Sequence, residues 1–234
     1  MRRDRLMAVP LACAFVLGVG TAGAQAAVAP KCEAAADVRA PNGSLAWHAE
    51  PRAQDHVEPA DAPALLVLDR PRVADGRCWV KVRLPSRPND ATGWLDTDTI
   101  QLRPTAWRIV VTRSARRVDV LRDGKVVRRF PVVVGAPSTP TPAGLFSITQ
   151  TWRGNPETFL GSWVLSLSAH SDVLMRYDGG DGRAALHGRG GASFLDPLGT
   201  AASHGCVRLS NETISWLVRT IGQTRLPGTP VRIQ

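Results

Sequence analysis

The sequence predicts a mainly β protein of two domains with one helix near its C-terminal end. Short runs of alternating apolar and polar residues recur along the chain, and clusters rich in Gly, Pro, Asn and Asp separate them. Only one segment, 211–221, carries apolar residues at helical spacing. The length of 234 residues and the 44% hydrophobic content are sufficient for two cores and exclude a disordered chain. No internal run reaches about 18 uncharged apolar residues, which excludes a polytopic membrane protein.

The formal net charge of +9 comes almost entirely from arginine. It fits an anionic partner such as nucleic acid, anionic lipid or a wall polymer, or it reflects coding bias towards arginine. No dense basic run is interleaved with aromatic residues, so we expect no nucleic-acid partner.

Residues 1–26 have the pattern of a secretory signal peptide. Arg2, Arg3 and Arg5 precede an uncharged stretch over 6–20, and the small residues of 21–24 follow. Cleavage is expected after Ala24 or Ala26, and the alternative is a retained anchor. The sequence thus predicts a secreted protein of the periplasm or cell wall.

Cleavage would leave three cysteines, Cys32, Cys78 and Cys206. An oxidising compartment favours pairing of structural thiols, and Cys32 with Cys78 is the natural pair within the N-terminal half. Their bridge would close a loop of about 45 residues and contribute about 4 kcal/mol. The alternative is two free buried thiols. Cys206 would remain as a candidate reactive thiol.

The first domain is expected over 36–103, after an N-terminal arm over 27–35. Strands are predicted at 64–68, 78–84, 93–95 and 99–102, around the turn-rich residues 85–90. The Trp-Val-Lys-Val strand at Trp79 and the Gly-Trp-Leu strand at Trp94 resemble those of bacterial SH3-like domains. This resemblance implies a small SH3-like β-barrel that binds wall peptide or glycan. The alternative is a spacer module with both Trp in its core.

The second domain is expected over 106–234, after a short linker. A hairpin is predicted around Asp123–Gly124, with strands at 117–121 and 126–130, and 131–135 continuing the second strand. The other predicted strands are 108–112, 145–149, 163–167, 184–187 and 229–233. The helix is expected to have Asn211 as its N-cap, an apolar face that includes Ile214 and Leu217, and Gly222 at its end.

Cys206 lies shortly before this helix, where the helix dipole favours a thiolate, and a nearby cation such as Arg208 would lower its pKa further. A nucleophilic thiol also needs a base, for which His170, His187 and His204 are candidates. His187 ends a predicted strand, while the role of His170 stays open. The alternatives are an inert thiol and a zinc site formed by His187, His204 and Cys206.

His187 is followed by 15 residues and then by Ser203–His204–Gly205–Cys206, with Arg208 two positions later. This pattern, together with the Thr-Pro-rich segment 134–146, resembles the L,D-transpeptidase family, the YkuD-type catalytic domain. The resemblance implies a β-sandwich-like catalytic domain with one helix after the catalytic Cys, and no metal or other cofactor.

The resemblance also implies residue roles. Cys206 would be the nucleophile and His187 its base, oriented by the carbonyl of Gly188. The oxyanion hole would comprise His204, Gly205 and Cys206. Substrate-binding roles fall to Arg208, Ser203, His204 and Asn211. A lid is expected over 189–198, and Tyr177 is expected in the core rather than in the substrate groove.

The implied reaction is peptidoglycan L,D-transpeptidation. Cys206 attacks a tetrapeptide stem, D-alanine leaves, and the diamino-acid amine of a second stem takes the acyl group, which gives a 3→3 cross-link. Carbapenems are expected to acylate Cys206. The alternatives are an L,D-carboxypeptidase, attachment of a protein to the wall by the same site, and a catalytically silent wall-binding protein.

Overall fold

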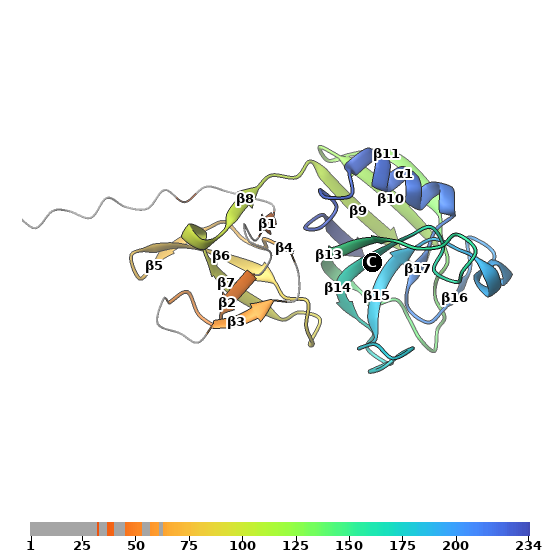
Figure 1. Cartoon of the computed structure of the whole chain (residues 1–234), viewed down its shortest axis with the longest axis horizontal. Helices are drawn as coiled ribbons and strands as arrows, with labels where there is room; N and C mark the ends of the chain where they lie inside the picture. Colours follow the sequence, from red (N-terminus) through yellow and green to blue (C-terminus); the bar gives the residue numbers. More distant parts are fainter. Residues whose placement is uncertain (1–31, 33–36, 40–44, 53–56, 61–62) are drawn as a thin grey trace, which may run out of the picture.

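The computed structural model describes residue 32 and residues 37–39, 45–52, 57–60 and 63–234. The predicted signal peptide and most of the predicted arm lie outside the described residues. Two β-rich parts are joined by the segment between β8 (Gln101–Arg103) and β9 (Trp107–Thr112), as Figure 1 shows. Within the described residues, no helix has the length and apolar character needed to cross a membrane.

The N-terminal module, the described residues up to Arg103, contains two antiparallel sheets. One has the order β4-β1-β8 and the other the order β3-β2-β7-β6-β5. The strands besides β8 are β1 (Asp37–Arg39), β2 (Leu45–His48), β3 (Val57–Ala60), β4 (Ala64–Leu66), β5 (Arg72–Ala74), β6 (Arg77–Arg83) and β7 (Thr92–Asp96). Leu65, Val80 and Leu95 are fully buried between them. The SH3-like assignment stays a prediction.

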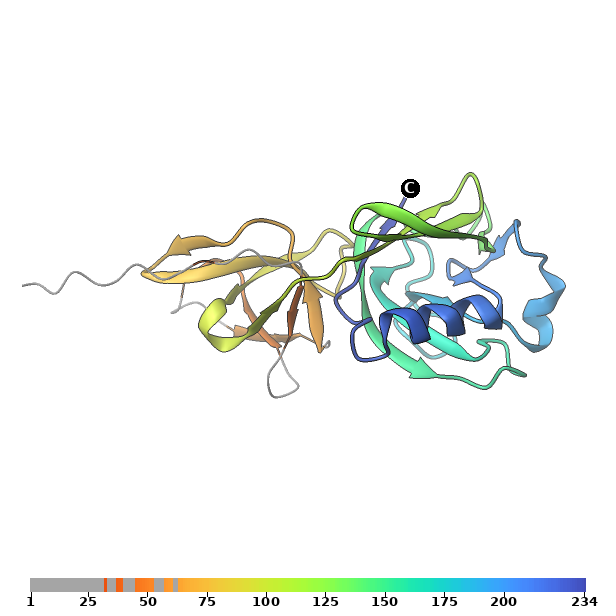
Figure 2. The same cartoon turned by 90° about the horizontal axis from the view of Figure 1, so that it is seen from above.

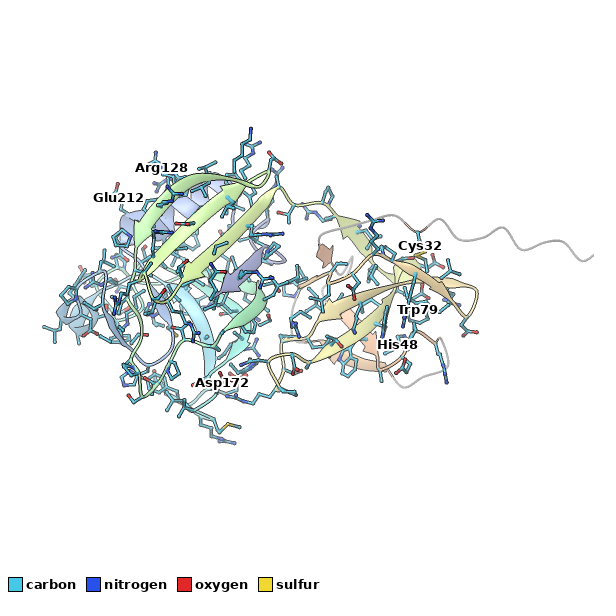
Figure 3. All side chains as sticks on the ribbon, turned by 180° about the vertical axis from the view of Figure 1, so that it is seen from behind. Cys32, His48, Trp79, Arg128, Asp172 and Glu212 are labelled. Carbon is cyan, nitrogen blue, oxygen red and sulfur yellow. A yellow bond between two sulfur atoms is a disulfide. The ribbon has the colours of Figure 1, made fainter. Side chains whose placement is uncertain are left out.

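A disulfide joins Cys32 to Cys78 of β6. Beside it, Trp79 is fully buried; its Nε1 donates to the carbonyl of Ala74 at 2.9 Å, and its ring meets His48 edge-on at 5.1 Å. Figure 3 labels Cys32, His48 and Trp79 together in this module. Side chains from both sheets, among them Leu65 of β4 and Leu95 of β7, form one apolar core in this module.

The C-terminal domain, from Trp107 onwards, is built on one mixed sheet of eight strands in the order β11-β10-β9-β18-β13-β14-β15-β17. Besides β9, its strands are β10 (Arg117–Arg122), β11 (Lys125–Pro131), β13 (Gly144–Arg153), β14 (Trp163–His170), β15 (Arg183–His187), β17 (Val207–Arg208) and β18 (Pro230–Ile233). β18 runs parallel to β9 and antiparallel to β13, so it joins the two halves of the sheet.

The sheet curls around the helix α1 (Asn211–Ile221), which lies between the β9–β11 part and the β13–β15 part in Figure 2. Ile214, Leu217 and Ile221 bury the apolar face of α1, and Trp216 packs on Phe130 of β11 at 5.5 Å between ring centroids. Arg128 of β11, labelled in Figure 3, lies over the Trp216 ring, with its guanidinium carbon 5.4 Å from the ring centroid. The curled sheet and this helix share a single core. The predicted mainly β fold is confirmed.

The hairpin predicted at Asp123–Gly124 forms between β10 and β11. Both residues have positive φ, 50° and 75°, which is the conformation of a type I′ turn. The predicted continuation of this strand through 131–135 is wrong. β11 ends at Pro131, and Val134–Gly135 (β12) pairs instead with Ala201–Ser203 (β16) in a separate parallel pair. Through this pairing, the residues that follow the hairpin lie beside the segment that precedes Cys206.

The structure also corrects the start of the helix. Ser210, not Asn211, is the N-cap, because its Oγ accepts from the amide of Thr213 at 3.0 Å. Gly222 ends the helix with φ 97°. Because Asn211 is not the cap, its side chain does not bond to the first turn of the helix and can contact other elements.

Candidate active site

A cleft of about 790 Å³ lies at the end of β15, beside β14 and the residues before α1. Its walls come from distant parts of the chain. The lining residues include Trp152, Phe159, Leu160, Leu174, Tyr177, His187, His204, Gly205, Cys206 and Arg208. The structure therefore brings the predicted His187 and Cys206 to one cleft.

His187 is the last residue of β15 and is 1% exposed. Its Nδ1 lies 2.7 Å from the carbonyl oxygen of Gly188. A carbonyl only accepts, so Nδ1 carries the proton and Nε2 is the basic nitrogen. Burial lowers the pKa of His187 to about 4, with Arg208 acting in the same direction and backbone hydrogen bonds to Gly188 and Leu160 opposing it. At neutral pH the imidazole is uncharged and can accept a proton.

Gly188 and Asn211 fix the backbone around His187. Asn211 Oδ1 accepts from the amides of Ser162 (2.9 Å) and Arg189 (3.1 Å), and its Nδ2 donates to the carbonyl of Arg189 at 2.7 Å. A Cβ on residue 188 would lie 2.2 Å from Asn211 Oδ1, so only glycine fits there. Asn211 contacts backbone groups and is not among the lining residues, so it acts as a positioning residue.

Cys206 is partly buried and is the free cysteine of the described chain. Burial raises the pKa of its thiol, while a backbone hydrogen bond with Ala185 and the charge of Arg208 lower it. The predicted lowering of this pKa is therefore wrong, because desolvation outweighs the nearby charge. The two-residue strand β17 also separates Cys206 from the start of the helix. Thiol and imidazole are both neutral in the resting site.

Ser203 shapes the turn that carries Cys206. Its Oγ donates to the carbonyl of Cys206 at 2.5 Å and accepts from the amide of Gly205 at 3.2 Å. Gly205 has φ 115°, which suits glycine in this turn. The Gly205 amide, predicted for the oxyanion hole, is thus already engaged by Ser203. In the described part of the chain, no acceptor is recorded for the amides of His204 and Cys206.

Arg208 is 3% exposed and pairs through Nη1 with Asp196, a residue that sequence reasoning did not identify. Its guanidinium carbon lies 4.7 Å from the centroid of the Phe159 ring, which in turn lies 6.2 Å from that of His187. Arg208 Nε is buried and has no hydrogen-bond partner among the described residues. Arg208 therefore holds Asp196 beside the cleft.

Segment 171–182, between β14 and β15, forms one wall of the cleft, to which it contributes Leu174 and Tyr177. Tyr177 is 45% exposed, stacks on His204 with 5.1 Å between ring centroids, and its OH lies 3.2 Å from His204 Nδ1. The prediction that Tyr177 packs in the core is wrong. A lid was predicted over 189–198, but no residue of that range lines the cleft.

His170 ends β14 and is 2% exposed. Its Nε2 lies 3.0 Å from Asp181 Oδ2. Burial lowers the pKa of His170, and the contact with Asp181 opposes that effect. His170 is not among the lining residues of the cleft, so it stabilises the base of segment 171–182.

No three His, Cys, Asp or Glu side chains are grouped to hold a metal ion anywhere in the described ranges. What the site offers is a thiol and an oriented neutral imidazole in one cleft, beside the backbone of 204–206. These are the elements of cysteine-dependent acyl transfer.

The profile of the L,D-transpeptidase catalytic domain, YkuD, matches residues 106–233. The chain belongs to this family. It is 29% identical over 125 residues to "Putative L,D-transpeptidase YkuD" of Bacillus licheniformis and 27% identical over 124 residues to the similarly named YqjB of Bacillus subtilis. These matches cover 53% and 48% of this chain, and 66% and 65% of the relatives, so the chain spans just under two thirds of their length.

Solved L,D-transpeptidases are also similar. One from Mycobacterium tuberculosis H37Rv is 18% identical, with a TM-score of 0.44, over 74% of this chain and 90% of that one. L,D-transpeptidase 3 from Mycobacterium tuberculosis, solved with a faropenem-derived adduct, is 16% identical, with a TM-score of 0.43, over 67% of this chain and 91% of that one.

Proposed function

We propose that this protein is a peptidoglycan L,D-transpeptidase that forms 3→3 cross-links through an acyl-enzyme on Cys206. The observation that carries the proposal is the placement of the Cys206 thiol and the neutral His187 in one cleft, with His187 Nδ1 held by Gly188. Membership of the L,D-transpeptidase family supports the reaction type.

The first half-reaction acylates the thiol. Cys206 Sγ attacks the carbonyl carbon of the L-centre that precedes a terminal D-alanine, and the thiol proton passes to His187 Nε2. In this proposal the amides of His204 and Cys206 donate to the resulting oxyanion. When the C–N bond breaks, His187 returns the proton to the amine of D-alanine. A neutral thiol and a neutral imidazole suit this order, because the proton moves only as the substrate reacts.

The second half-reaction transfers the acyl group. The side-chain amine of a diamino acid on a second stem attacks the thioester, and its proton passes to His187. The C–S bond then breaks as His187 gives this proton to Cys206 Sγ, which restores the thiol. Arg208 lines the cleft, and its positive charge favours the binding of a substrate carboxylate there. The same thiol is the site that we expect carbapenems to acylate.

The placement of the reaction outside the cytoplasm is part of the proposal. Residues 1–26 have the signal-peptide pattern, and the Cys32–Cys78 disulfide fits an oxidising compartment. We propose a location in the periplasm or cell wall, with the SH3-like N-terminal module contacting wall peptide or glycan.

The test is mass spectrometry of the products from disaccharide-tetrapeptide substrates, with the parent protein and its Cys206→Ala variant. We expect a dimer that lacks one D-alanine from the parent and no product from the variant. Tripeptide monomer alone would make water the acceptor and the protein an L,D-carboxypeptidase. Absence of product and of carbapenem acylation in the parent would contradict the proposal and favour a wall-binding role.

A further inference from the structure

The turn between β6 and β7 of the N-terminal module, residues 85–91, reaches the C-terminal domain beside β14 (Figure 1). Arg87 and Asn89 of this turn make hydrogen bonds across the boundary, and all of these go to residues 170–181. That range contains most of the cleft wall that carries Tyr177. The contact therefore links one module to the substrate cleft of the other.

Arg87 connects three carbonyl groups of this wall. Its Nη1 donates to Ser171 at 2.6 Å, and its Nη2 donates to Leu174 at 3.2 Å and to Asp181 at 3.0 Å. These carbonyls lie at the start, in the middle and near the end of segment 171–182. A planar guanidinium with several fixed donors can hold such a set, whereas a single ammonium has a different geometry.

Asn89 fixes the point where the segment leaves β14. Its Oδ1 accepts from the amide of His170 at 2.8 Å, and its Nδ2 donates to the carbonyl of His170 at 2.8 Å and to Asp172 Oδ1 at 2.9 Å. The side-chain amide thus pairs with both backbone groups of the last residue of the strand. Asp172, labelled in Figure 3, lies on the segment immediately after it.

Segment 171–182 has little apolar anchoring of its own. Three of its large apolar side chains, Val173, Met175 and Tyr177, are 52%, 61% and 45% exposed, and Leu174 is half-buried. Its internal bonds close its ends, from the amide of Ser171 to the carbonyl of Gly182 at 2.8 Å, and its tip, between Tyr177 and Gly180. Within its own domain the segment is also held at Asp181 by His170 and Arg183, and at Tyr177 by His204. The hydrogen bonds from the N-terminal module add contacts at Ser171, Asp172 and Leu174.

We propose that Arg87 and Asn89 are positioning residues for the substrate cleft, and that the N-terminal module controls substrate binding by holding segment 171–182 in place. Because Tyr177 of this segment contacts His204, its position sets the width of the cleft beside Cys206. The chemistry at Cys206 and His187 does not depend on this contact. The inference rests on the proposed function for the identity of the substrate only.

The first test needs no substrate. Arg176 is an exposed trypsin site at the middle of segment 171–182. In the full chain, Arg87→Ala and Asn89→Ala should each speed cleavage after Arg176 by about tenfold, because local opening becomes less costly when these bonds are lost. Ser86→Ala, an exposed neighbour in the same turn, is the matched control and should leave the rate unchanged. Equal rates in all four proteins would overturn the proposal.

The second test separates binding from chemistry. We expect Arg87→Ala to raise KM for the tetrapeptide donor by about tenfold and to change kcat by less than about threefold, since the lost bonds act on binding. Iodoacetamide is a small reagent whose binding does not depend on the position of segment 171–182. Its rate of Cys206 alkylation should therefore be the same in this variant as in the parent. Arg87→Lys should give an intermediate KM.

Faster cleavage with an unchanged KM would show that the contact only joins the two modules, and would overturn the proposal. So would a joint loss of kcat, alkylation rate and melting temperature, which marks general destabilisation. If the parent itself forms no product, the proposed function fails, while the cleavage rates still decide whether Arg87 and Asn89 hold the segment.

Discussion

The two walls of the cleft are held by different parts of the molecule. The wall with His187 is fixed within the C-terminal domain, where Asn211 connects the first turn of α1 to the backbone at Ser162 and Arg189. The other wall, segment 171–182, is contacted within its own domain by His170 and Arg183 at Asp181 and by His204 at Tyr177, and it also receives hydrogen bonds from the N-terminal module. The comparison indicates that the reacting groups are preorganised by one domain, whereas access to them is shared between two.

The variant that we expect to disturb only the wall with His187 is Gly188→Ala. Its Cβ would meet Asn211 Oδ1 at 2.2 Å and the amide of Ser162 at 2.9 Å, so the backbone that orients His187 must shift. We expect kcat/KM to fall by about 10²-fold, the effect of displacing a catalytic group by about 1 Å. Steady-state kinetics measures it. Trypsin cleavage after Arg176 should stay at the parent rate, and faster cleavage would show that the walls are coupled.

A second prediction concerns stability against pH. The pKa of His187 is lowered to about 4 in the folded protein, against 6.5 for an ordinary histidine, so the unfolded chain binds more protons between these values. Stability should therefore fall as the pH drops from 6.5 towards 4, by about 3 kcal/mol from this residue. Urea unfolding at pH 7 and pH 4 should show this extra loss in the parent and not in His187→Gln.

The matched comparison is His170→Gln, which changes a buried histidine at the end of β14 that does not line the cleft. Burial lowers the pKa of His170 too, but Asp181 opposes the shift, so this variant should keep most of the parent's loss of stability in acid. An acid loss that is equal in parent and His187→Gln would contradict the assignment of a buried, neutral His187.

The smallest expected effect is that of Tyr177→Phe. This change removes the OH that lies 3.2 Å from His204 Nδ1 and keeps the stacked ring. We expect KM to rise by about twofold to fivefold with kcat unchanged, since one exposed hydrogen bond contributes little. Steady-state kinetics with the tetrapeptide donor measures it, and a fall in kcat alone would instead place the OH in the chemical step.

Local patterns explain what the sequence could predict. The Asp123–Gly124 turn and the apolar face of α1 depend on neighbouring residues, and both form as predicted. The spacing from His187 to Cys206 places both in one cleft because β15 and β17 are adjacent strands. Strands β1 to β3 were not predicted, since residues 27–60 show little apolar alternation.

Non-local contacts explain what the sequence could not predict. Arg87 meets carbonyls more than 80 positions away in the chain, and a contact of that kind leaves no periodic signal. The raised pKa of Cys206 has the same origin, because its burial depends on how β15 and the cleft pack around it. Position relative to a helix was a poor guide to the charge state of this thiol.

The central place of β18 in the sheet has a consequence for disulfide formation during folding. β18 follows every other described strand in sequence, yet it lies between β9 and β13, so the sheet stays in two halves until this strand inserts. Such long-range pairing is slow to form. Until the sheet is complete, the Cys206 thiol is open to oxidation while the Cys32–Cys78 disulfide forms. Refolding in an oxidising buffer should therefore give molecules in which Cys206 is disulfide-bonded to Cys32 or Cys78. Refolding in a reducing buffer, followed by oxidation, should give the native Cys32–Cys78 disulfide.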